Sequence, residues 1–450
     1  MSKVYKIKKG LDIPLLGEAE KVVRQAEPAQ YYGVKPIDFH WMRTKLLAKE
    51  GDRVKAGSPL FFNKLQPDVQ FPSPVSGKVV SVNRGERRKI LEVVVEADSK
   101  TEYEAFGKGE PRDMTREQVS DKLLKSGLWA FIRQRPYSIS ANPKDTPKSI
   151  FISGFDTAPL SPDNDLVVKG EQENFQRGID ALSKLTDGTI HLNLNAEYPP
   201  SEVFTGAKGV QHNYFKGPHP SGNVGVQINQ IDPINQGDIV WYVYPQDVIT
   251  IGRLFEKGIY DASKIVALTG SEVDKPIYYR VLRGTSIKPM VNGNVKDGDL
   301  RYISGNVLTG KQINSEGYVG FFDDQITVIP EGKYHELLGW AMPGFGKFST
   351  SRAFFSWLRP NKKYRIDTNL KGGERAYVMS GEYEKVCPLD IYPVQLIKAI
   401  MIGDIELMEK LGIYEVDEED FALCEFVCTS KTPVQSIVRK GLNMMIEEMS

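Results

Sequence analysis

The residues best suited to hold a metal are three cysteines, two of which, Cys424 and Cys428, are spaced C-x3-C. Zinc and iron–sulfur sites take four ligands and commonly use C-x2-C pairs, so these two thiols and Cys387 cannot supply a four-cysteine cluster. On a helix predicted from residue 418, Cys424 and Cys428 lie at i and i+4, which is typical of buried core thiols. An odd number of cysteines also favours a reducing compartment without disulfides. The sequence therefore predicts no metal site.

Side chains for acid–base or nucleophilic catalysis occur in patterns that favour structural roles. No G-x-S-x-G elbow is present, and no H-x-x-x-H spacing occurs among the histidines, which are His40, His191, His212, His219 and His335. Asp323 and Asp324 are predicted to lie in a turn. The acidic run 417–420 is predicted at the start of a helix, where negative charge meets the helix dipole. We therefore predict no catalytic residue in this chain.

Glycine-rich segments could cradle phosphate groups, but their context does not favour this. The densest glycine cluster, residues 206–209 and 217–222, is not expected to stand between a strand and a helix. Residues 154–160, which follow a predicted strand, lack G-x-G-x-x-G. A Pro/Gly loop that shapes a domain surface is therefore the favoured interpretation over a phosphate site.

Short apolar strands separated by glycine turns organise residues 50–95. The order E-G-D-x-V-x-x-G-x-x-L, then S-P-x-x-G-x-V, is similar to the barrel-sandwich fold of lipoyl and biotinyl carrier domains. Those domains attach a cofactor to a lysine at a hairpin tip, next to Met or Asp. The corresponding hairpin here reads Asn63-Lys64-Leu65, so Lys64 is predicted to be a solvated surface lysine. The sequence thus predicts a carrier-type fold without a carrier site.

The other elements predict a multidomain α/β and β protein, because 450 residues exceed the size of one core. A capping box begins a helix at Thr115 and Gly127 ends it; a strand is expected at 307–310 and a helix over 393–411. The predicted domains are a barrel-sandwich (biotinyl/lipoyl-like) domain, 1–96; a Rossmann-like α/β domain, 112–258; a β-grasp (SLBB-like) domain, 264–330; a mixed connecting tract, 331–374; and a C-terminal helical domain, 375–450.

Composition narrows the class of partner. Lys+Arg and Asp+Glu are both 58, and this neutrality argues against a nucleic-acid binder. No apolar run comes near the roughly 20 residues that span a bilayer, and the N-terminus lacks the apolar core of a signal peptide. If the protein works at a membrane, we expect another chain to supply the anchor. The basic N-terminal strand and the basic, aromatic tract 347–363 are the expected docking surfaces.

Motifs along nearly the whole chain resemble one family, the A subunit of the sodium-translocating NADH:quinone oxidoreductase. The motifs that carry the resemblance are residues 8–14 (KKGLDIP), 73–80 (SPVSGKVV), 126–129 (SGLW), 217–220 (GPHP), 244–249 (YPQDVI), 339–344 (GWAMPG), 384–390 (EKVCPLD) and 418–424 (EEDFALC). They occur in the family's order, so chance is a poor explanation.

The resemblance implies a peripheral subunit on the cytoplasmic face of the bacterial inner membrane. Its partners would be the five other subunits of a sodium-exporting pump, integral membrane subunits among them. Flavins and iron–sulfur centres would lie in those partners, and this chain would carry no covalent cofactor and bind ubiquinone or menaquinone. The family is related to the C subunit of the Rnf complex and to the NADH-binding flavoprotein of complex I. Their four-cysteine motifs, and the second relative's flavin-binding glycine loop, are absent here.

The resemblance also points to a quinone site in two segments, 35–42 and 132–139. The residues are Phe39, His40, Trp41, Arg133, Arg135, Pro136 and Tyr137. Aromatic rings could supply flat apolar walls, guanidinium and hydroxyl groups could donate to the quinone carbonyls, and His40 or Tyr137 could deliver a proton. Two alternatives remain open: a cofactor-free scaffold that holds the complex together, and an NADH-binding diaphorase subunit.

Overall fold

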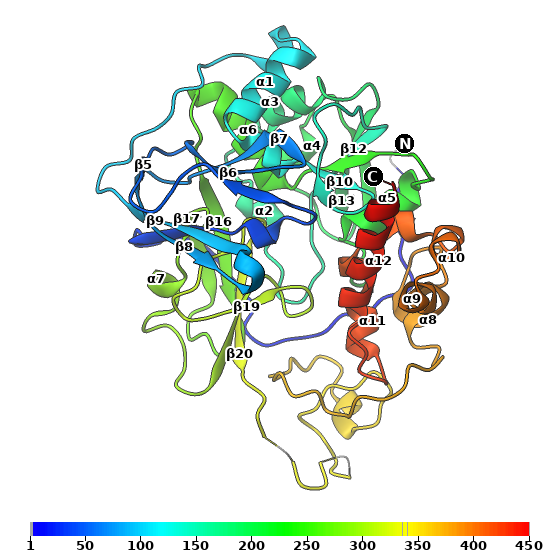
Figure 1. Cartoon of the computed structure of the whole chain (residues 1–450). Helices are drawn as coiled ribbons and strands as arrows, with labels where there is room; N and C mark the ends of the chain where they lie inside the picture. Colours follow the sequence, from blue (N-terminus) through cyan, green and yellow to red (C-terminus); the bar gives the residue numbers. More distant parts are fainter. Residues whose placement is uncertain (1–2, 335, 340, 450) are drawn as a thin grey trace.

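The computed structural model describes residues 3–334, 336–339 and 341–449. His335, Met1 and Ser2, and Trp340 of the predicted loop and motif 339–344, lie outside the described residues. Figure 1 shows the barrel strands (blue) beside the α/β domain, with the C-terminal helices (orange and red) on the opposite side of the molecule. Residues 331–375 (yellow to orange) form the lower end of that view.

The α/β domain is built on a sheet in which the first five strands, in sheet order, run parallel, and the sixth is antiparallel to both of its neighbours. In sheet order the strands are β1 (Val4–Lys6), β14 (Gln211–Lys216), β13 (Thr189–Asn195), β12 (Ser149–Ser153), β15 (Val240–Tyr242), β10 (Arg133–Arg135) and β11 (Ile139–Ser140). The helices of this part are α1 (Arg116–Lys125), α2 (Asn164–Val167), α3 (Gln172–Leu182), α4 (Glu202–Thr205), α5 (Val224–Ile231) and α6 (Pro245–Lys257). The predicted capping box at Thr115 and the left-handed Gly127 (φ 73°) are both confirmed.

The barrel consists of two small antiparallel sheets. One has the order β3 (Tyr31–Val34), β9 (Ile90–Ala97), β8 (Gly77–Arg84) and β5 (Arg53–Val54); the other has β4 (Thr44–Leu46), β6 (Pro59–Asn63) and β7 (Gln66–Pro72). Phe61, Phe71 and Val95 are fully buried in the core that these strands share with the α/β domain. The burial follows the alternation of the strands, because successive side chains point to opposite faces.

The third sheet holds the residues of the predicted β-grasp domain. Its order is β19 (Lys311–Ile313), β18 (Leu300–Ser304), β20 (Gln325–Pro330), β16 (Ser263–Thr269), β17 (Ile277–Leu282) and β2 (Glu20–Gln25), with helix α7 (Lys288–Val291). The predicted strand at 307–310 is wrong. Asn306 instead fixes a turn, because its Oδ1 accepts from the backbone N–H groups of Leu308 and Thr309 at 2.8 and 3.0 Å.

The first residues of the chain join two sheets outside the barrel. β1 pairs in parallel with β14 at the edge of the α/β sheet, and β2 pairs in parallel with β17. Residues 1–96 therefore do not correspond to one sheet system, since the barrel strands run from Tyr31 to Ala97. The sequence of such short strands does not show which strand each will pair with, because the pairing depends on which sheet edge is free.

The C-terminal part is made of α8 (Tyr383–Val386), α9 (Pro393–Ile402), α10 (Ile405–Lys410), α11 (Ala422–Val427) and α12 (Val434–Met449). The single helix predicted over 393–411 is wrong. Gly403 takes a left-handed φ of 73° and ends α9, and the Asp404 side chain then caps α10 by accepting from Leu407 N–H at 3.0 Å.

The glycine cluster also differs from its prediction. Residues 217–223 do stand between a strand, β14, and a helix, α5. The polar sequence of β14 (QHNYFK) lacks the run of apolar and β-branched residues typical of strands, so only its pairing with β1 and β13 shows that it is one. No helix among the described residues is long and apolar enough to cross a membrane.

Candidate functional site

The main cluster of buried charge lies around Arg135, one of the predicted site residues. Its side chain is 0% exposed and faces the acidic segment 417–420, some 284 residues away in sequence. Nη1 lies 3.0 Å from Asp420 Oδ2, and Nη2 lies 2.7 Å from Glu419 Oε1 and 3.7 Å from Asp417 Oδ2. Strand β10 thereby connects the α/β sheet to the C-terminal helices.

The backbone of the acidic segment is fixed by its own side chains. Asp417 caps a short 3₁₀ helix, Glu418–Phe421, and Asp420 returns a bond from the third position, at 2.9 Å from Asp417 N. The predicted position at a helix start is confirmed. The carboxylates have a further role, because they also bind cations from other parts of the chain.

Two partners of these carboxylates come from α12 and from the loop before β4. Arg439 pairs with both Asp417 and Glu418, and its Nη1 donates to the Tyr137 carbonyl at 2.8 Å. His40 Nε2 lies 3.1 Å from Glu418 Oε1. The predicted segments 35–42 and 132–139 therefore meet the same carboxylates, although about ninety residues separate them in sequence.

The charges of the cluster balance only if it holds a proton. The four carboxylates of residues 417–420 face three guanidinium groups, those of Arg133, Arg135 and Arg439, and the His40 imidazole. The pKa of Glu419 is about 7, above its ordinary value. Burial raises it most, the positive charge of Arg135 lowers it, and the negative charges of Asp420 and Asp417 raise it further. Because an unpaired buried charge is costly, a proton on Glu419 would bring the four carboxylates and three guanidinium groups to neutrality.

Arg133 and Phe39 form an aromatic and cationic layer beside the cluster. The Arg133 guanidinium lies over the rings of Tyr242 (5.0 Å) and Phe322 (4.7 Å). Phe39 is 7% exposed, and its ring centroid lies 4.3 Å from Phe71 and 5.4 Å from Phe322. The faces of Phe39 are therefore occupied by other rings of the protein, whereas Arg133 remains partly exposed.

The other predicted site residues lie next to these groups. Trp41, with a φ of 53°, and Tyr137 are partly exposed, and Pro136 is buried. The Tyr137 ring centroid lies 6.3 Å from that of Tyr414. Burial, followed by the charge of Glu409, raises the pKa of Tyr137, so its hydroxyl stays a neutral donor.

The structure thus brings His40, Arg133, Arg135 and Tyr137 to one acidic segment. Phe39 lies next to them, because it packs against Phe322, over which Arg133 lies. Sequence reasoning missed the partners of these residues: the acidic segment itself, Arg439, Tyr242 and Phe322. An acidic run of four residues and an arginine in a C-terminal helix are common on solvated surfaces. Their meeting with Arg135 depends on tertiary contact, so no local signal could have identified it.

A second place for a ligand is the carboxyl end of the parallel strands, where open α/β sheets usually bind. Ser153, Asn193, Asn213 and Gln227 are buried there and hydrogen-bonded to one another at 2.8–2.9 Å. In the loop that follows β14, backbone N–H groups donate to protein side chains: His219 N to Asp12 at 2.9 Å and Gly222 N to Thr157 at 3.0 Å. These groups are engaged within the protein.

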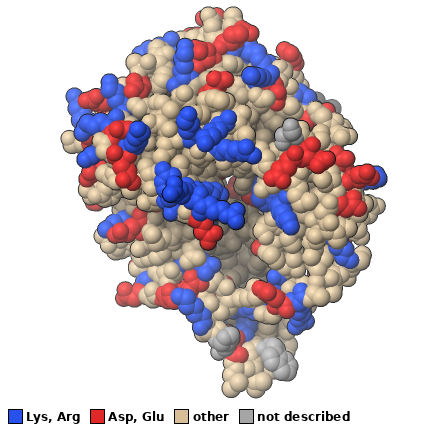
Figure 2. Space-filling model, in the orientation of Figure 1, with Lys and Arg blue, Asp and Glu red and all other residues tan. Residues whose placement is uncertain are grey.

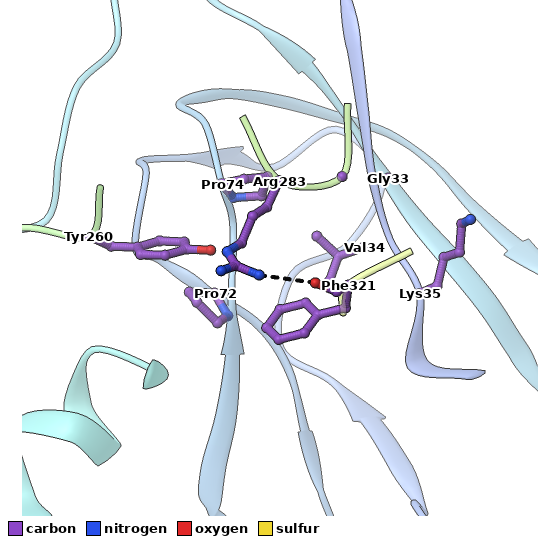
Figure 3. Close-up of a pocket in the computed structure, with 9 residues that line it drawn as sticks. Gly33, Val34, Lys35, Pro72, Pro74, Tyr260, Arg283 and Phe321 are labelled. Atoms are coloured by element: carbon purple, nitrogen blue, oxygen red, sulfur yellow. Dashed lines mark hydrogen bonds between the residues drawn. The ribbon is translucent and has the colours of Figure 1, made fainter. Parts of the chain in front are cut away.

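The remaining candidates have structural explanations. The three cysteines are buried and free, and the Tyr383 hydroxyl donates to Cys428 Sγ at 3.0 Å, so the prediction of core thiols is confirmed. Within the described ranges no group of three or more His, Cys, Asp or Glu could hold a metal. Figure 3 shows a cavity where the three N-terminal domains meet, with Arg283 between Tyr260 and Phe321. It has room for about one water molecule, which is far less than a quinone ring requires.

Comparisons with known proteins agree on one family. Three family models match: the NqrA N-terminal barrel-sandwich hybrid domain at residues 5–98, the NqrA second alpha/beta domain at 114–260, and the NQRA C-terminal domain, of SLBB type, at 265–315. The A subunit of the Na(+)-translocating NADH-quinone reductase from Yersinia pestis bv. Antiqua (strain Angola) is 40% identical, over 99% of this chain and 100% of the relative. The chain belongs to this family. The corresponding A subunit from Photorhabdus laumondii is 38% identical with the same coverage.

Membership in the family confirms part of the predicted fold, namely the barrel-sandwich, α/β and SLBB domains. Among solved structures, an NAD+-reducing [NiFe]-hydrogenase in the air-oxidized state matches with a TM-score of 0.38 and 10% identity, covering 77% of this chain and 67% of that one. A likeness that weak says nothing further about this molecule.

Proposed function

We propose that this chain is the quinone-binding subunit of a membrane respiratory complex that transfers electrons from NADH to quinone and exports sodium. Its relatives are named as the A subunit of Na(+)-translocating NADH-quinone reductases, and these names support the complex and its chemistry. One observation in particular supports the quinone site: the two segments expected to contact quinone meet at one place, through His40, Arg133, Arg135 and Tyr137.

The side chains of the proposed site divide into two kinds by exposure. His40, Trp41, Arg133 and Tyr137 are partly exposed and can reach a ligand. We assign Trp41 to one apolar wall and the other three to donors for the quinone oxygens, because imidazole, guanidinium and phenol groups all carry N–H or O–H donors.

Phe39, Arg135 and Pro136 are buried. In this proposal they are positioning residues: Phe39 packs behind Phe322, on which Arg133 rests, and Arg135 holds the acidic segment in place. A proton for the bound quinone can come from His40 or from the hydroxyl of Tyr137, with the carboxylates of the cluster as its reservoir.

The site lies where two bodies of the molecule meet. The His40–Glu418 pair joins the loop before β4 to the C-terminal helices. Figure 2 shows a hollow between the basic side chains at the centre of the view and those helices. A concave place between domains is where ligand sites commonly occur.

Three substitutions test the site in the assembled enzyme. Tyr137→Phe removes a hydroxyl and keeps the ring, His40→Asn removes an imidazole, and Trp41→Ala removes a wall. Loss of one donor should weaken quinone binding by about 0.5–1.5 kcal/mol, and loss of the wall by about 1–3 kcal/mol. Tyr198→Phe is the matched control, because the Tyr198 side chain is 68% exposed.

Quinone binding and KM are measured on each variant, with the midpoint of thermal unfolding as a check on folding. Unchanged binding in all three folded variants would contradict the site. If the complex nevertheless assembled normally, the scaffold role would be favoured instead.

The diaphorase alternative concerns the carboxyl end of the α/β sheet. The hydrogen bonds among Ser153, Asn193, Asn213 and Gln227 disfavour it, because these groups and the loop N–H groups are already paired within the protein. We therefore expect the purified chain to show no flavin absorbance and no binding of NADH. A stoichiometric flavin or a saturable response to NADH would overturn this assignment.

The placement of the chain completes the proposal. We propose a peripheral position on the cytoplasmic face of the bacterial inner membrane, with five partner subunits that hold the flavins and iron–sulfur centres. We also propose the ancestral relation to the C subunit of the Rnf complex and to the flavoprotein of complex I. Fractionation of cells that lack the integral subunits should release the chain from the membrane pellet at moderate salt.

A further inference from the structure

An unbalanced basic surface lies at the tips of two barrel hairpins. In the part of the chain that the structure describes, seven exposed cations there form no ion pair, and they outnumber the exposed acids of the same hairpins, Asp68 and Glu86. We call them the basic rim; they are Arg43, Lys45, Lys64, Arg84, Arg87, Arg88 and Lys89. Other cations of this neutral protein form ion pairs, as in Arg53–Asp98 and Lys311–Asp38. Figure 2 shows Lys and Arg side chains gathered at the centre of one face, beside the hollow.

The rim is built by two different sheets of the barrel. Arg43 N–H donates to Asn63 Oδ1 at 3.1 Å, which ties the segment before β4 to the tip of the β6–β7 hairpin that carries Lys64. Residues 84–89 form the tip of the β8–β9 hairpin, and Arg84 Nη1 there donates to the Arg88 carbonyl at 3.3 Å. The chain runs from His40 and Trp41 directly into Arg43, so the Arg43 part of the rim borders the proposed quinone site.

Like charges in excess over their counter-charges repel one another, so such a surface is stabilised by an anionic partner. Nucleic acid is a poor candidate, because the chain as a whole is neutral. The choice is then between an acidic protein surface and a surface of anionic lipid headgroups.

Exposed apolar side chains on another segment favour lipid. The segment 334–358, at the lower end of the view in Figure 1, exposes Leu337 (91%), Phe355 (53%) and Trp357 (50%). The same segment carries Arg352, and Arg359 follows it directly, whereas Lys347 is paired with Glu336. Aromatic side chains together with basic ones are the composition of segments that enter the headgroup layer of a bilayer.

We propose that the basic rim docks on anionic lipid headgroups and that it turns the adjoining segment with His40 and Trp41 toward the bilayer. The choice of lipid rests in part on the proposed function, because quinones are dissolved in the bilayer and must enter the site from it. Each cation near an anionic membrane surface strengthens binding about fivefold.

Vesicle co-sedimentation of the full chain tests the proposal without any quinone or partner subunit. Phosphatidylcholine vesicles are compared with vesicles that also contain phosphatidylglycerol, at low and high salt. The rim variant Arg84→Ser/Arg87→Ser/Arg88→Ser/Lys89→Ser removes four exposed cations at a hairpin tip. The control variant Lys144→Ser/Lys169→Ser/Lys208→Ser/Lys275→Ser removes four other exposed cations that also have no ion pair among the described residues.

We expect the wild-type chain and the control variant to bind the anionic vesicles, and salt to release them. The rim variant should bind weaker by about fivefold for each cation removed. Equal losses in the two variants, or equal binding to neutral and anionic vesicles, would overturn the proposal. A rim variant that binds vesicles normally but fails to join its partner subunits would assign the rim to an acidic protein surface instead. Quinone binding is measured separately in detergent. If quinone binds but the vesicle result fails, only the lipid proposal is wrong; if quinone does not bind, the proposed function is wrong.

Discussion

At the scale of residues, Arg135 decides how the functional region holds together. Its fully buried guanidinium lies near three carboxylates, and Arg439 pairs with two. Both cations contact Asp417, so they share the work of neutralising the acidic segment. Breaking a buried ion pair from one side leaves an uncompensated charge, which costs more than the pair contributes. The cluster is therefore sensitive to the loss of any one cation.

Arg135→Ala should lower the free energy of unfolding by about 3–5 kcal/mol, because Asp417, Glu419 and Asp420 would keep their burial and lose their main counter-charge. Urea denaturation measures the change. Arg53→Ala is the control; its side chain is 70% exposed and pairs with Asp98, so a change of about 0–1 kcal/mol is expected. Similar small losses in both variants would show that the cluster is not tightly coupled to folding.

Because of Glu419, the free energy of unfolding should decrease as the pH rises from about 4.5 to 7. Its folded-state pKa of about 7 lies above its ordinary value of 4.5, so the folded protein binds more protons than the unfolded chain in this interval. The side chain is 25% exposed and can exchange that proton with solvent. The contribution to stability is complete below the lower pKa and decreases by about 1–3 kcal/mol as the pH rises.

Glu419→Gln removes the titration and should flatten this part of the curve of unfolding free energy against pH. Glu197→Gln, at an exposed carboxyl, serves as the control. A variant curve that falls as steeply as that of the wild type would assign the proton to another group of the cluster.

At the scale of elements, helices α3 and α6 approach so closely that only glycine fits at their crossing. A Cβ on Gly178 would lie 2.1 Å from the Val248 carbonyl oxygen, and one on Gly252 would lie 1.8 Å from that of Asn174. Both clashes are with backbone, which cannot turn aside as a side chain can. The close crossing brings the two helices together against the sheet that carries β10 and Arg135.

Gly178→Ala and Gly252→Ala should each destabilise the protein by about 1–3 kcal/mol through overpacking, although alanine favours a helix. Gly373→Ala is the matched control, because a Cβ there meets nothing within 4 Å. The midpoints of denaturant unfolding measure all three. Stabilisation at either helix position would show that the helices separate more easily than their contacts indicate.

At the scale of the whole molecule, segments distant in sequence hold the parts together. The stretch 98–110 is fastened to α6, with Phe106 N–H bonded to the Gly258 carbonyl at 2.7 Å and Gly109 N–H to that of Phe255 at 3.0 Å. By contrast, the tract 334–379 exposes many apolar side chains and contains little regular structure among its described residues. A protease should therefore reach the tract 334–379 more easily than the stretch 98–110.

Limited trypsin digestion should cut first within 341–379 and spare 98–110, because cleavage needs a segment that opens locally. The two fragments should remain together in size-exclusion chromatography. The shared core of Ile7 and Ile13 with Leu396, and the bonds of Arg135 and Arg439 to the acidic segment, hold them. Fragments that separate in native buffer, or a first cut within 98–110, would contradict this view.

The sequence by itself determined the parts that depend on local patterns. The capping box at Thr115, the left-handed Gly127 and the apolar face of α3 follow from the residues that form them, and so do the barrel hairpins. The motifs carried the family, and the burial of the cysteines followed from their number and spacing. The segments of the candidate site came from the resemblance to the family.

Tertiary structure alone decided what joins those parts. The pairing of β1 with β14 and of β2 with β17 depends on which sheet edges are open once the domains are packed. The partners of Arg135 lie about 285 residues away, and the occupied faces of Phe39 depend on rings from the SLBB domain. A local pattern cannot predict a contact over such a distance, because the same run of acidic residues can face either solvent or a guanidinium group.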